Sequence, residues 1–425
     1  MTLIRTIILI SGLLGISIPS IVIAQDEPVR PIFWEIESVD AMKYSRDVAR
    51  EKLSDKAYDV IIENQVKVIA DSGATHIAIG TPYDAEFLPF LKRWVEAARR
   101  HNLNVWFRGN WSGWEGWFEY PKISRTQHIA KTKEFILKNR SLFKDGDVFV
   151  ACPECENGGP GDPRNNGDLK GHRDFLIDEH EMMEDAFNEI GKDVMFNINS
   201  MNGDVARLVM DKETTKSLGG IIAIDHYVKT KEKLVNDIKQ LASDGEAKIV
   251  LAEFGAPIPD IHGNLNETAQ AKWIYEALNE VAKLPEVVGV NYWVGFGGST
   301  SLWNPQTYVP KLGATVLSTA FNPPTVSGTL KDELDRPITK ARIKNEYGET
   351  LSDSNGKFVL PYLEETGRTV YIYADNHHDM ITTISKDEEG KIITLERSKP
   401  TFGYRILLLV RAVKEFFINL LDFGN

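Results

Sequence analysis

The sequence has only two cysteines, Cys152 and Cys155, among its 425 residues. A network of disulfides therefore does not hold this chain together, and its stability has to come from the packing of apolar cores. A chain of this length can bury full-sized cores and is typical of two or three domains.

The sequence also lacks runs of basic residues. It has 49 Lys and Arg against 61 Asp and Glu, which gives a formal net charge of -12. Because proteins that bind a phosphate backbone carry basic patches, we expect no nucleic acid partner. Hydrophobic residues make up 42% of the chain and charged residues 26%, which indicates folded globular domains rather than a disordered or polytopic membrane protein.

One long hydrophobic run stands at the N-terminus. Mostly apolar residues follow Arg5 up to Ala24, and acidic residues come directly after them. This pattern is typical of a secretory signal, so residues 1–24 are predicted to be a signal peptide that is cleaved after Ala24. An uncleaved N-terminal anchor is the alternative, because about 17 apolar residues is the lower limit for spanning a bilayer. Either interpretation predicts a secreted or cell-surface protein.

A second apolar stretch lies near the other end, where residues 403–425 are predicted to form an amphipathic helix. Arg411, Lys414 and Glu415 interrupt it, so it is too short and too charged to span a bilayer. Two interpretations stay open. The helix could lie on a membrane surface, giving peripheral membrane or cell-surface association, or it could dock on a neighbouring domain.

Short β-branched or aromatic runs alternate with helical stretches over residues 28–322, which predicts βα units around a parallel sheet. No Gly-rich phosphate-binding loop opens any of the helices, which argues against an open, doubly wound sheet. The length fits a (β/α)8 TIM barrel, which takes about 250 residues plus insertions. The eight predicted strands are residues 31–36, 75–80, 104–109, 147–153, 193–199, 220–225, 248–252 and 289–293.

After Pro323-Pro324 the pattern changes to short alternating strands with turn signals, which predicts a small all-β sandwich over residues 323–397. The expected strands are residues 326–330, 341–344, 357–360, 370–374 and 392–396. The sequence of this region resembles the carboxypeptidase regulatory-like β-sandwich at residues 326–330, 335–341 and 352–358. That resemblance implies a non-catalytic accessory module.

Two carboxylates stand where the active site of such a barrel lies, at the C-terminal ends of the strands. Glu154 follows the fourth predicted strand, and Glu253 directly follows the apolar seventh strand. A carboxylate pair facing across a sugar ring is what glycoside cleavage requires. One group protonates the leaving oxygen while the other attacks the anomeric carbon or activates water.

The motif Ala-Glu-Phe-Gly at residues 252–255 resembles the nucleophile motif of glycoside hydrolase clan A, and Asn-Tyr-Trp at 291–293 resembles its strand-eight tryptophan floor. The overall pattern is most similar to the family 5 cellulase and mannanase type. The resemblance implies a retaining hydrolase of β-linked poly- or oligosaccharides. Glu253 would be the nucleophile, Glu154 the acid/base and Trp293 part of the sugar site.

Strand four departs from that family, because Pro153-Glu154 stands where the family has Asn-Glu. Glu156 is therefore kept as an alternative acid/base. Asn157 follows Glu156 instead of preceding a Glu, which puts its expected contact with the sugar 2-hydroxyl in doubt.

Four further side chains are candidates for substrate binding. The resemblance implies that His226 or Tyr227, on strand six, hydrogen-bonds the nucleophile. Arg108, which closes strand three, either supplies a positive charge near the nucleophile or pairs with a neighbouring acid. Asn199 ends the fifth predicted strand at the same barrel mouth.

The loop after strand three is rich in aromatic residues, and we expect Trp111 and Trp114 to be platforms on which sugar rings stack. We expect no metal and no cofactor. Zinc would need two more recognisable ligands beside Cys152 and Cys155, so a local disulfide or two small thiols in the site wall is the preferred interpretation.

Two functional hypotheses follow. The first is an exported retaining glycoside hydrolase, whose residues would equally suit a transglycosylase. The alternative is a catalytically inactive barrel that serves as a surface carbohydrate-binding or adhesion protein, and the irregular Pro153-Glu154 motif favours it slightly.

Overall fold

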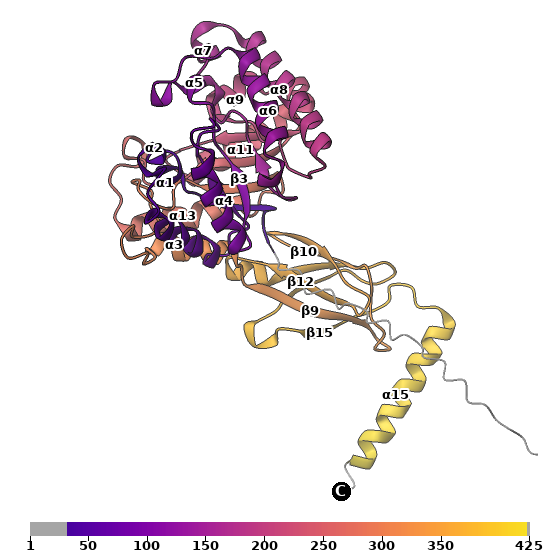
Figure 1. Cartoon of the computed structure of the whole chain (residues 1–425). Helices are drawn as coiled ribbons and strands as arrows, with labels where there is room; N and C mark the ends of the chain where they lie inside the picture. Colours follow the sequence, from indigo (N-terminus) through magenta and orange to yellow (C-terminus); the bar gives the residue numbers. More distant parts are fainter. Residues whose placement is uncertain (1–31, 423–425) are drawn as a thin grey trace, which may run out of the picture. The chain divides into compact units, whose positions relative to one another are not determined.

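The structure is a computed structural model that describes residues 32–422. The predicted signal peptide, residues 1–24, lies outside the described residues. The described part consists of an α/β barrel, a small all-β domain and a C-terminal helix (Figure 1). This confirms the predicted fold class, whereas the exact domain boundaries stay predictions.

The barrel is an eight-stranded parallel sheet with the order β4-β3-β2-β1-β8-β7-β6-β5. A parallel bridge between Val148 of β4 and Met195, on the segment that leads into β5, links the two edges of this sheet. The strands are β1 (Ile36–Asp40), β2 (His76–Ile79), β3 (Asn104–Phe107), β4 (Val148–Phe149), β5 (Ser200–Asn202), β6 (Ile221–Asp225), β7 (Lys248–Phe254) and β8 (Val287–Tyr292).

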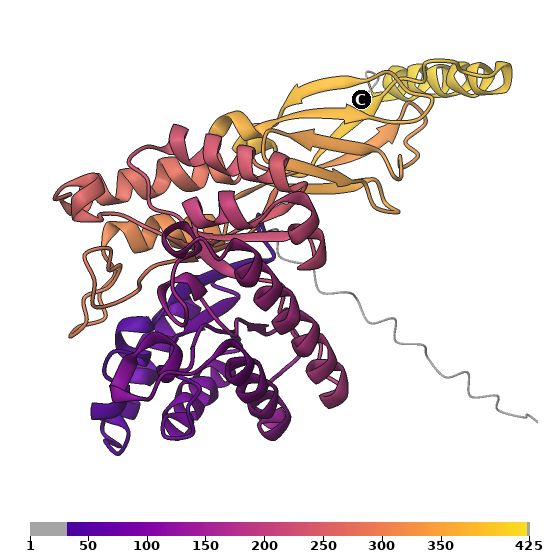
Figure 2. The same cartoon turned by 90° about the horizontal axis from the view of Figure 1, so that it is seen from above.

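Helices surround the strands (Figures 1 and 2). In α4 the apolar residues fall on one face, so that Phe90, Leu91 and Trp94 are buried while the charged residues stay outside. The longer barrel helices are α3 (Tyr58–Asp71), α4 (Leu88–Arg100), α6 (Arg125–Lys138), α8 (Leu169–Ile190), α11 (Lys231–Gly245), α13 (Glu267–Val281) and α14 (Leu312–Phe321). The short ones are α1 (Met42–Ser45), α2 (Ala49–Lys52), α5 (Ser112–Glu115), α7 (Pro163–Asn166), α9 (Gly203–Val209), α10 (Lys212–Ser217) and α12 (Pro259–His262).

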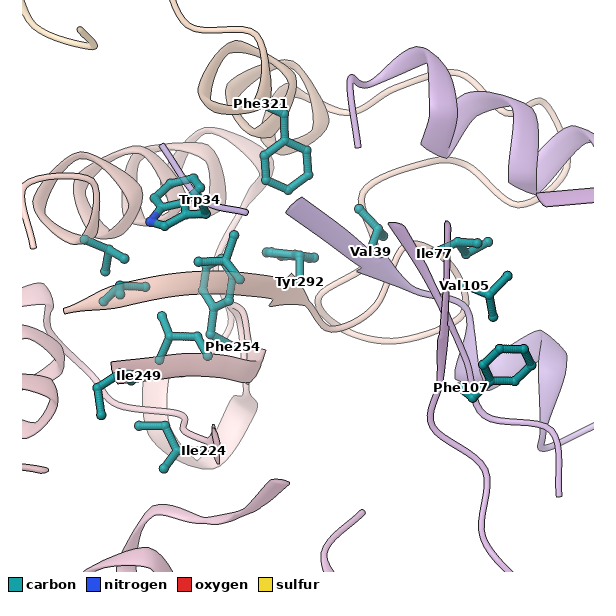
Figure 3. Packing of buried hydrophobic residues seen from close by; sticks show 14 of the residues in the cluster. Trp34, Val39, Ile77, Val105, Phe107, Ile224, Ile249, Phe254, Tyr292 and Phe321 are labelled. Atoms are coloured by element: carbon teal, nitrogen blue, oxygen red, sulfur yellow. The ribbon is translucent and has the colours of Figure 1, made fainter. Parts of the chain in front are cut away.

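The strand side chains form two separate cores, because successive residues of a strand point to opposite faces. Residues such as Ile77, Val105 and Ile249 belong to the large cluster that the strands share with the helices (Figure 3). Their strand neighbours form a small cluster of their own inside the barrel. Its buried members are Ile36, Ala78, Trp106, Val148, Val150, Ile198, Ala223, Val250 and Ala252.

The fifth predicted barrel strand, residues 193–199, ends directly before β5, and the other seven overlap the observed strands. The first was nevertheless placed too early. It was expected at residues 31–36, whereas β1 is Ile36–Asp40. The apolar and aromatic residues before Ile36 favoured the wrong interval, because β1 itself contains the polar residues Glu37, Ser38 and Asp40. All three are buried. Buried polar and charged side chains are rare unless they have polar partners, so the sequence pattern did not indicate a strand here.

The small β domain has two sheets. One is antiparallel, with the order β11-β10-β13-β14, and the other is mixed, with the order β12-β9-β15, because β15 pairs with β9 in parallel. All five predicted strands are present. The two short strands β11 and β14 were missed because their sequences, GETL and MITT, lack an alternation of apolar and charged residues. The strands are β9 (Thr325–Asp332), β10 (Arg342–Asn345), β11 (Gly348–Leu351), β12 (Lys357–Pro361), β13 (Thr369–Tyr373), β14 (Met380–Thr383) and β15 (Lys391–Leu395).

The predicted C-terminal helix is present as α15 (Phe402–Asp422). Near its start Tyr404 is buried, and its hydroxyl donates a hydrogen bond to Glu333 Oε2 at 2.8 Å. Several apolar side chains of its first turns, including Leu407 and Leu409, are exposed. Among the described residues no helix combines the length and the apolar character that a membrane crossing needs.

Asp147 gives a test of the barrel's packing. This fully buried carboxylate accepts hydrogen bonds from the Val105 and Lys144 backbone N–H groups and from the Arg99 guanidinium. Asp147→Ala should lower the free energy of unfolding by about 3–5 kcal/mol, because it leaves these buried donors without an acceptor. Denaturant titration followed by circular dichroism measures this change.

The matched control is Asp71→Ala on α3, whose exposed ion pair with Lys67 should contribute less than about 1 kcal/mol. Equal losses in the two variants would contradict the importance of the buried carboxylate.

Candidate active site

The two predicted carboxylates meet at the C-terminal ends of the strands. Glu253 lies near the end of β7 and is 7% exposed, and Glu154 comes after β4. One carboxylate oxygen each of Glu154, Asp225 and Glu253 lie within 4.8 Å of one another. The barrel therefore brings together the carboxylates of strands four and seven, and Asp225 of β6 joins them.

Arg108 connects the acidic residues of this site. Its Nη1 donates to Asp40 Oδ2 at 2.8 Å and to Glu253 Oε1 at 2.9 Å, and its Nη2 lies 3.3 Å from Asp225 Oδ2. The side chains of Arg108 and Asp40 are fully buried. Both interpretations of Arg108 thus hold, since it places a positive charge beside Glu253 and also pairs with neighbouring acids.

Tyr227 holds the other oxygen of Glu253. Its hydroxyl donates to Glu253 Oε2 at 2.7 Å, so both carboxylate oxygens of Glu253 accept a hydrogen bond. His226, the alternative candidate, instead pairs through Nε2 with Asp237 Oδ2 of α11 at 2.8 Å. The expectation that His226 contributes to the sugar site is corrected, because adjacent residues leaving a strand point in opposite directions.

The charges around Arg108 affect one another strongly. Burial raises the pKa of Asp225 well above its usual value, and the nearby charge of Glu253 raises it further. Burial also raises the pKa of Asp40, although Arg108 opposes this effect. For Arg108, burial works against the charged form, but the combined field of Glu253, Asp225 and Asp40 raises its pKa well above the usual value.

Glu154 has a different environment. Burial raises its pKa to about 7, and the charges of Glu253 and Glu156 add to the effect. Its backbone N–H donates to Ser200 O at 2.8 Å, which ties the loop after β4 to β5. A carboxyl group with this pKa is protonated in a large fraction of molecules near neutral pH.

Glu156, the alternative acid/base, has a different hydrogen-bond partner. Its Oε1 accepts a hydrogen bond from the Asn202 backbone N–H at 2.7 Å, and its side chain is buried. It is not a member of the carboxylate cluster of Glu154, Asp225 and Glu253. Asn157, next to it, is exposed to solvent.

Trp293 follows β8 and is half-buried beside Tyr227, with the two ring centroids 6.0 Å apart. Lys43 Nζ lies 5.5 Å from the centroid of the Trp293 ring. The Trp293 Nε1 and Asn199 Nδ2 atoms are buried and have no hydrogen-bond partner among the described residues. The Trp293 donor lies beside Tyr227, whereas no contact among the described residues places the Asn199 side chain at the carboxylates.

Trp111 and Trp114 do not form the expected platform. They are 5% and 3% exposed, and their Nε1 atoms donate to Thr132 Oγ1 and to the Cys155 carbonyl. Trp114 also stacks on Phe175, with centroids 5.0 Å apart. Their faces are covered by protein, so this prediction is corrected for both residues.

Asp225 was not predicted as a site residue, and Asp40 is a second residue of the site that sequence reasoning missed. It ends β1, and its carboxylate contacts Arg108. The signal that could have found it is an acidic residue at the end of a strand, directly before the next helix. That signal was overlooked because the first strand was placed several residues too early.

Cys152 and Cys155 are joined by a disulfide that brackets Glu154. By distance alone His128, Cys152 and Glu179 form a group that could hold a metal. However, His128 Nδ1 already faces Glu179 Oε1 at 2.6 Å, its Nε2 faces Asn110 Oδ1 at 3.0 Å, and the sulfur is in the disulfide. The carboxylates around Glu253 likewise already share the charge of Arg108.

A comparison with protein-family models gives no match for this sequence, and a comparison with curated proteins also gives none. A comparison with solved structures finds glycosidases at 12–14% sequence identity. A GH5_18 protein from Bifidobacterium longum subsp. longum, in complex with Manβ1-4GlcNAc, is 12% identical, with a TM-score of 0.49 over 72% of this chain and 86% of that chain. The β-glycosidase BGL167 is 14% identical, with a TM-score of 0.46 over 68% and 96%.

A β-glucuronidase of Ruminococcus gnavus is 13% identical, with a TM-score of 0.42 over 62% of this chain. This chain spans 46% of the length of that protein. The barrel of this chain is established by its own strand order and register.

The electrostatic coupling of the two glutamates can be measured directly. Glu253→Gln removes a negative charge beside Glu154, so the pKa of Glu154 should fall from about 7 towards its usual value. Carbon-13 NMR titration of labelled glutamate side chains measures this pKa, and the Glu154→Gln variant identifies which signal belongs to Glu154. Glu189→Gln, on the exposed surface of α8, is the control and should leave the titration of Glu154 unchanged.

Proposed function

We propose that this chain is a retaining glycoside hydrolase that cleaves β-linked poly- or oligosaccharides. The observation that carries the proposal is the pair Glu154 and Glu253, whose carboxylate oxygens lie within 4.8 Å across the barrel mouth. Retaining enzymes have carboxyl groups about 5–5.5 Å apart, whereas inverting enzymes need about 6.5–9.5 Å to admit a water molecule. The short separation favours retention.

The environments of the two groups fit two different roles. Glu253 accepts hydrogen bonds from Arg108 and Tyr227, which orient the carboxylate for attack, as a nucleophile requires. Glu154, with a pKa of about 7, can donate a proton to the leaving oxygen. Two carboxyl groups with such contrasting environments are a recurring arrangement in acid/base catalysis.

The reaction then takes two steps. Glu253 attacks the anomeric carbon while Glu154 protonates the departing oxygen, and a covalent glycosyl-enzyme forms. Glu154, now ionised, removes a proton from a water molecule that hydrolyses this intermediate. Because the ester of Glu253 is neutral, the pKa of Glu154 falls at this stage and suits its new role as a base.

The sugar site extends over the half-buried face of Trp293, beside Tyr227. Apolar faces of pyranose rings pack well on indoles. The unpartnered donors Trp293 Nε1 and Asn199 Nδ2 would bind sugar hydroxyls. The exposed Asn157 lies at the rim of the same loop as Glu154 and could contact a more distant sugar.

The remaining expectations belong to the same proposal. The signal-like segment at residues 1–24 supports export, to the medium or the cell surface. The β domain at residues 323–397 would be an accessory module of the carboxypeptidase regulatory-like type. The exposed apolar side chains of α15, with Arg411 among them, would suit association with a membrane surface.

Substitution of the two glutamates tests the chemistry. Glu253→Gln should abolish the release of reducing sugar from a panel of β-linked glycans while sugar binding remains. Glu154→Gln should lower kcat by roughly 10²–10⁴-fold, the usual contribution of a general acid. The surface variant Glu189→Gln should keep the wild-type rate.

Unchanged turnover in Glu253→Gln would rule out the nucleophile. A protein that binds a glycan but releases no reducing sugar from any panel member would support the alternative, an inactive carbohydrate-binding barrel. Proton NMR of the first product distinguishes retention from inversion, and product sizes distinguish hydrolysis from transglycosylation.

The pH dependence follows from the state of Glu154. The acid must be protonated in the first step, so kcat/KM should fall as the pH rises through about 7. Initial rates between pH 5 and pH 9 measure this decrease in kcat/KM. In Glu154→Gln the decrease should disappear, because no titrating acid remains. If the decrease persists, another group causes it.

A further inference from the structure

We propose that the Cys152–Cys155 disulfide is a positioning element for Glu154, so that proton donation to the leaving group depends on this bond being closed. The inference rests on the proposed function above. It concerns the two cysteines, which have no part in the two-carboxylate mechanism itself.

The first observation is the difference between the two glutamates in how their side chains are held. Glu253 is fixed by Arg108 and Tyr227. Among the described residues, no side chain or backbone group hydrogen-bonds the carboxylate of Glu154. The position of the Glu154 carboxylate therefore depends on the backbone that carries it.

The second observation is the conformation of that backbone. Glu154 has a φ of 47° and a ψ of 52°, which is the left-handed region. Residues with a Cβ rarely occupy this region, because the Cβ approaches the carbonyl oxygen too closely. An unrestrained loop would favour another conformation at this residue, and the carboxylate would then move away from Glu253.

The third observation is that the disulfide spans this residue. The bond joins the residues on either side of Pro153-Glu154 and holds their Cα atoms 5.1 Å apart. Both cysteines are buried, and the carbonyl of Cys155 accepts a hydrogen bond from Trp114 Nε1 at 3.2 Å. The closed ring thus connects the strained residue to the packed loop after β3, including the buried Trp114.

Opening the bond is a two-electron reduction. A dithiol such as dithiothreitol gives up two electrons and two protons and becomes a cyclic disulfide, while the sulfurs of Cys152 and Cys155 become two thiols. The predicted export of the chain would place it where disulfides persist. A reducing environment would then lower turnover without removing either catalytic carboxylate.

The test uses leaving groups of different basicity. For Cys152→Ser and Cys155→Ser, kcat on an unactivated β-linked glycan should fall about 100-fold, the lower part of the range that a general acid contributes. On the 2,4-dinitrophenyl glycoside of the same sugar, kcat/KM, which reports the first step, should change by less than about threefold because that leaving group needs no proton, whereas kcat/KM on the unactivated glycan should show the full loss. Glu154→Gln should show the same selective loss.

The double variant distinguishes the effect of losing the disulfide from the effect of replacing each cysteine side chain. Because one bond is lost in every case, Cys152→Ser/Cys155→Ser should be no slower than either single variant. Wild-type rates on the unactivated glycan in all three variants would overturn the inference. Equal losses on both substrates would also overturn it, because they would indicate a general structural role.

The pKa of Glu154 tests the inference without any turnover. In the serine variants the pKa of Glu154, measured by carbon-13 NMR, should fall from about 7 as the carboxyl group leaves its buried position. An unchanged value would contradict the inference. If the serine variants do not fold, wild-type protein reduced with dithiothreitol replaces them. Two free thiols per chain and a native circular dichroism spectrum then show that the disulfide is open and the protein is still folded.

The result for Glu253→Gln distinguishes a failure of the proposed hydrolase mechanism from a failure of the proposed role of the disulfide. If that variant turns over glycans normally, the proposed hydrolase mechanism fails whatever the cysteine variants do. If it is inactive while the cysteine variants behave as wild type in rate and in the pKa of Glu154, the mechanism stands and only the role of the disulfide is wrong.

Discussion

The site of this protein depends on one buried cation. The Arg108 guanidinium lies within hydrogen-bond or ion-pair distance of Asp40, Asp225 and Glu253, which come from three different strands. Burying so many charges is costly unless each finds a partner, so neither the arginine nor the acids could be there alone. The same contacts that make the burial tolerable connect β1, β6 and β7 to Arg108 after β3 and fix the direction of Glu253.

The two glutamates differ because, among the described residues, the hydrogen bonds of this network reach only Glu253. Glu253 is oriented by two hydrogen-bond donors, whereas burial and nearby negative charge raise the pKa of Glu154 to about 7. Under the proposed function, a single constellation supplies both a nucleophile and an acid. Its weakness is that the acid is held by its backbone, in a left-handed conformation inside a small disulfide ring.

Much of this could be predicted where local sequence carries the signal. The apolar seventh strand ending in Glu253 and the periodic helices indicated a barrel, and Tyr227 and Arg108 were expected near the nucleophile. The errors occurred where a side chain's direction decides its role. Trp111 and Trp114 lie in the expected loop but turn into the core, and His226 leaves its strand on the opposite side from Tyr227.

The sequence by itself determined the alternation of strands and helices, and with it the end of the barrel at which Glu154 and Glu253 stand, because hydrophobic periodicity and strand ends are local properties. Only the tertiary structure decided which acids share Arg108, that Asp40 is among them, and that Glu154 instead of Glu156 joins Glu253. Those choices are set by contacts between residues far apart in the chain, and by the desolvation that accompanies them.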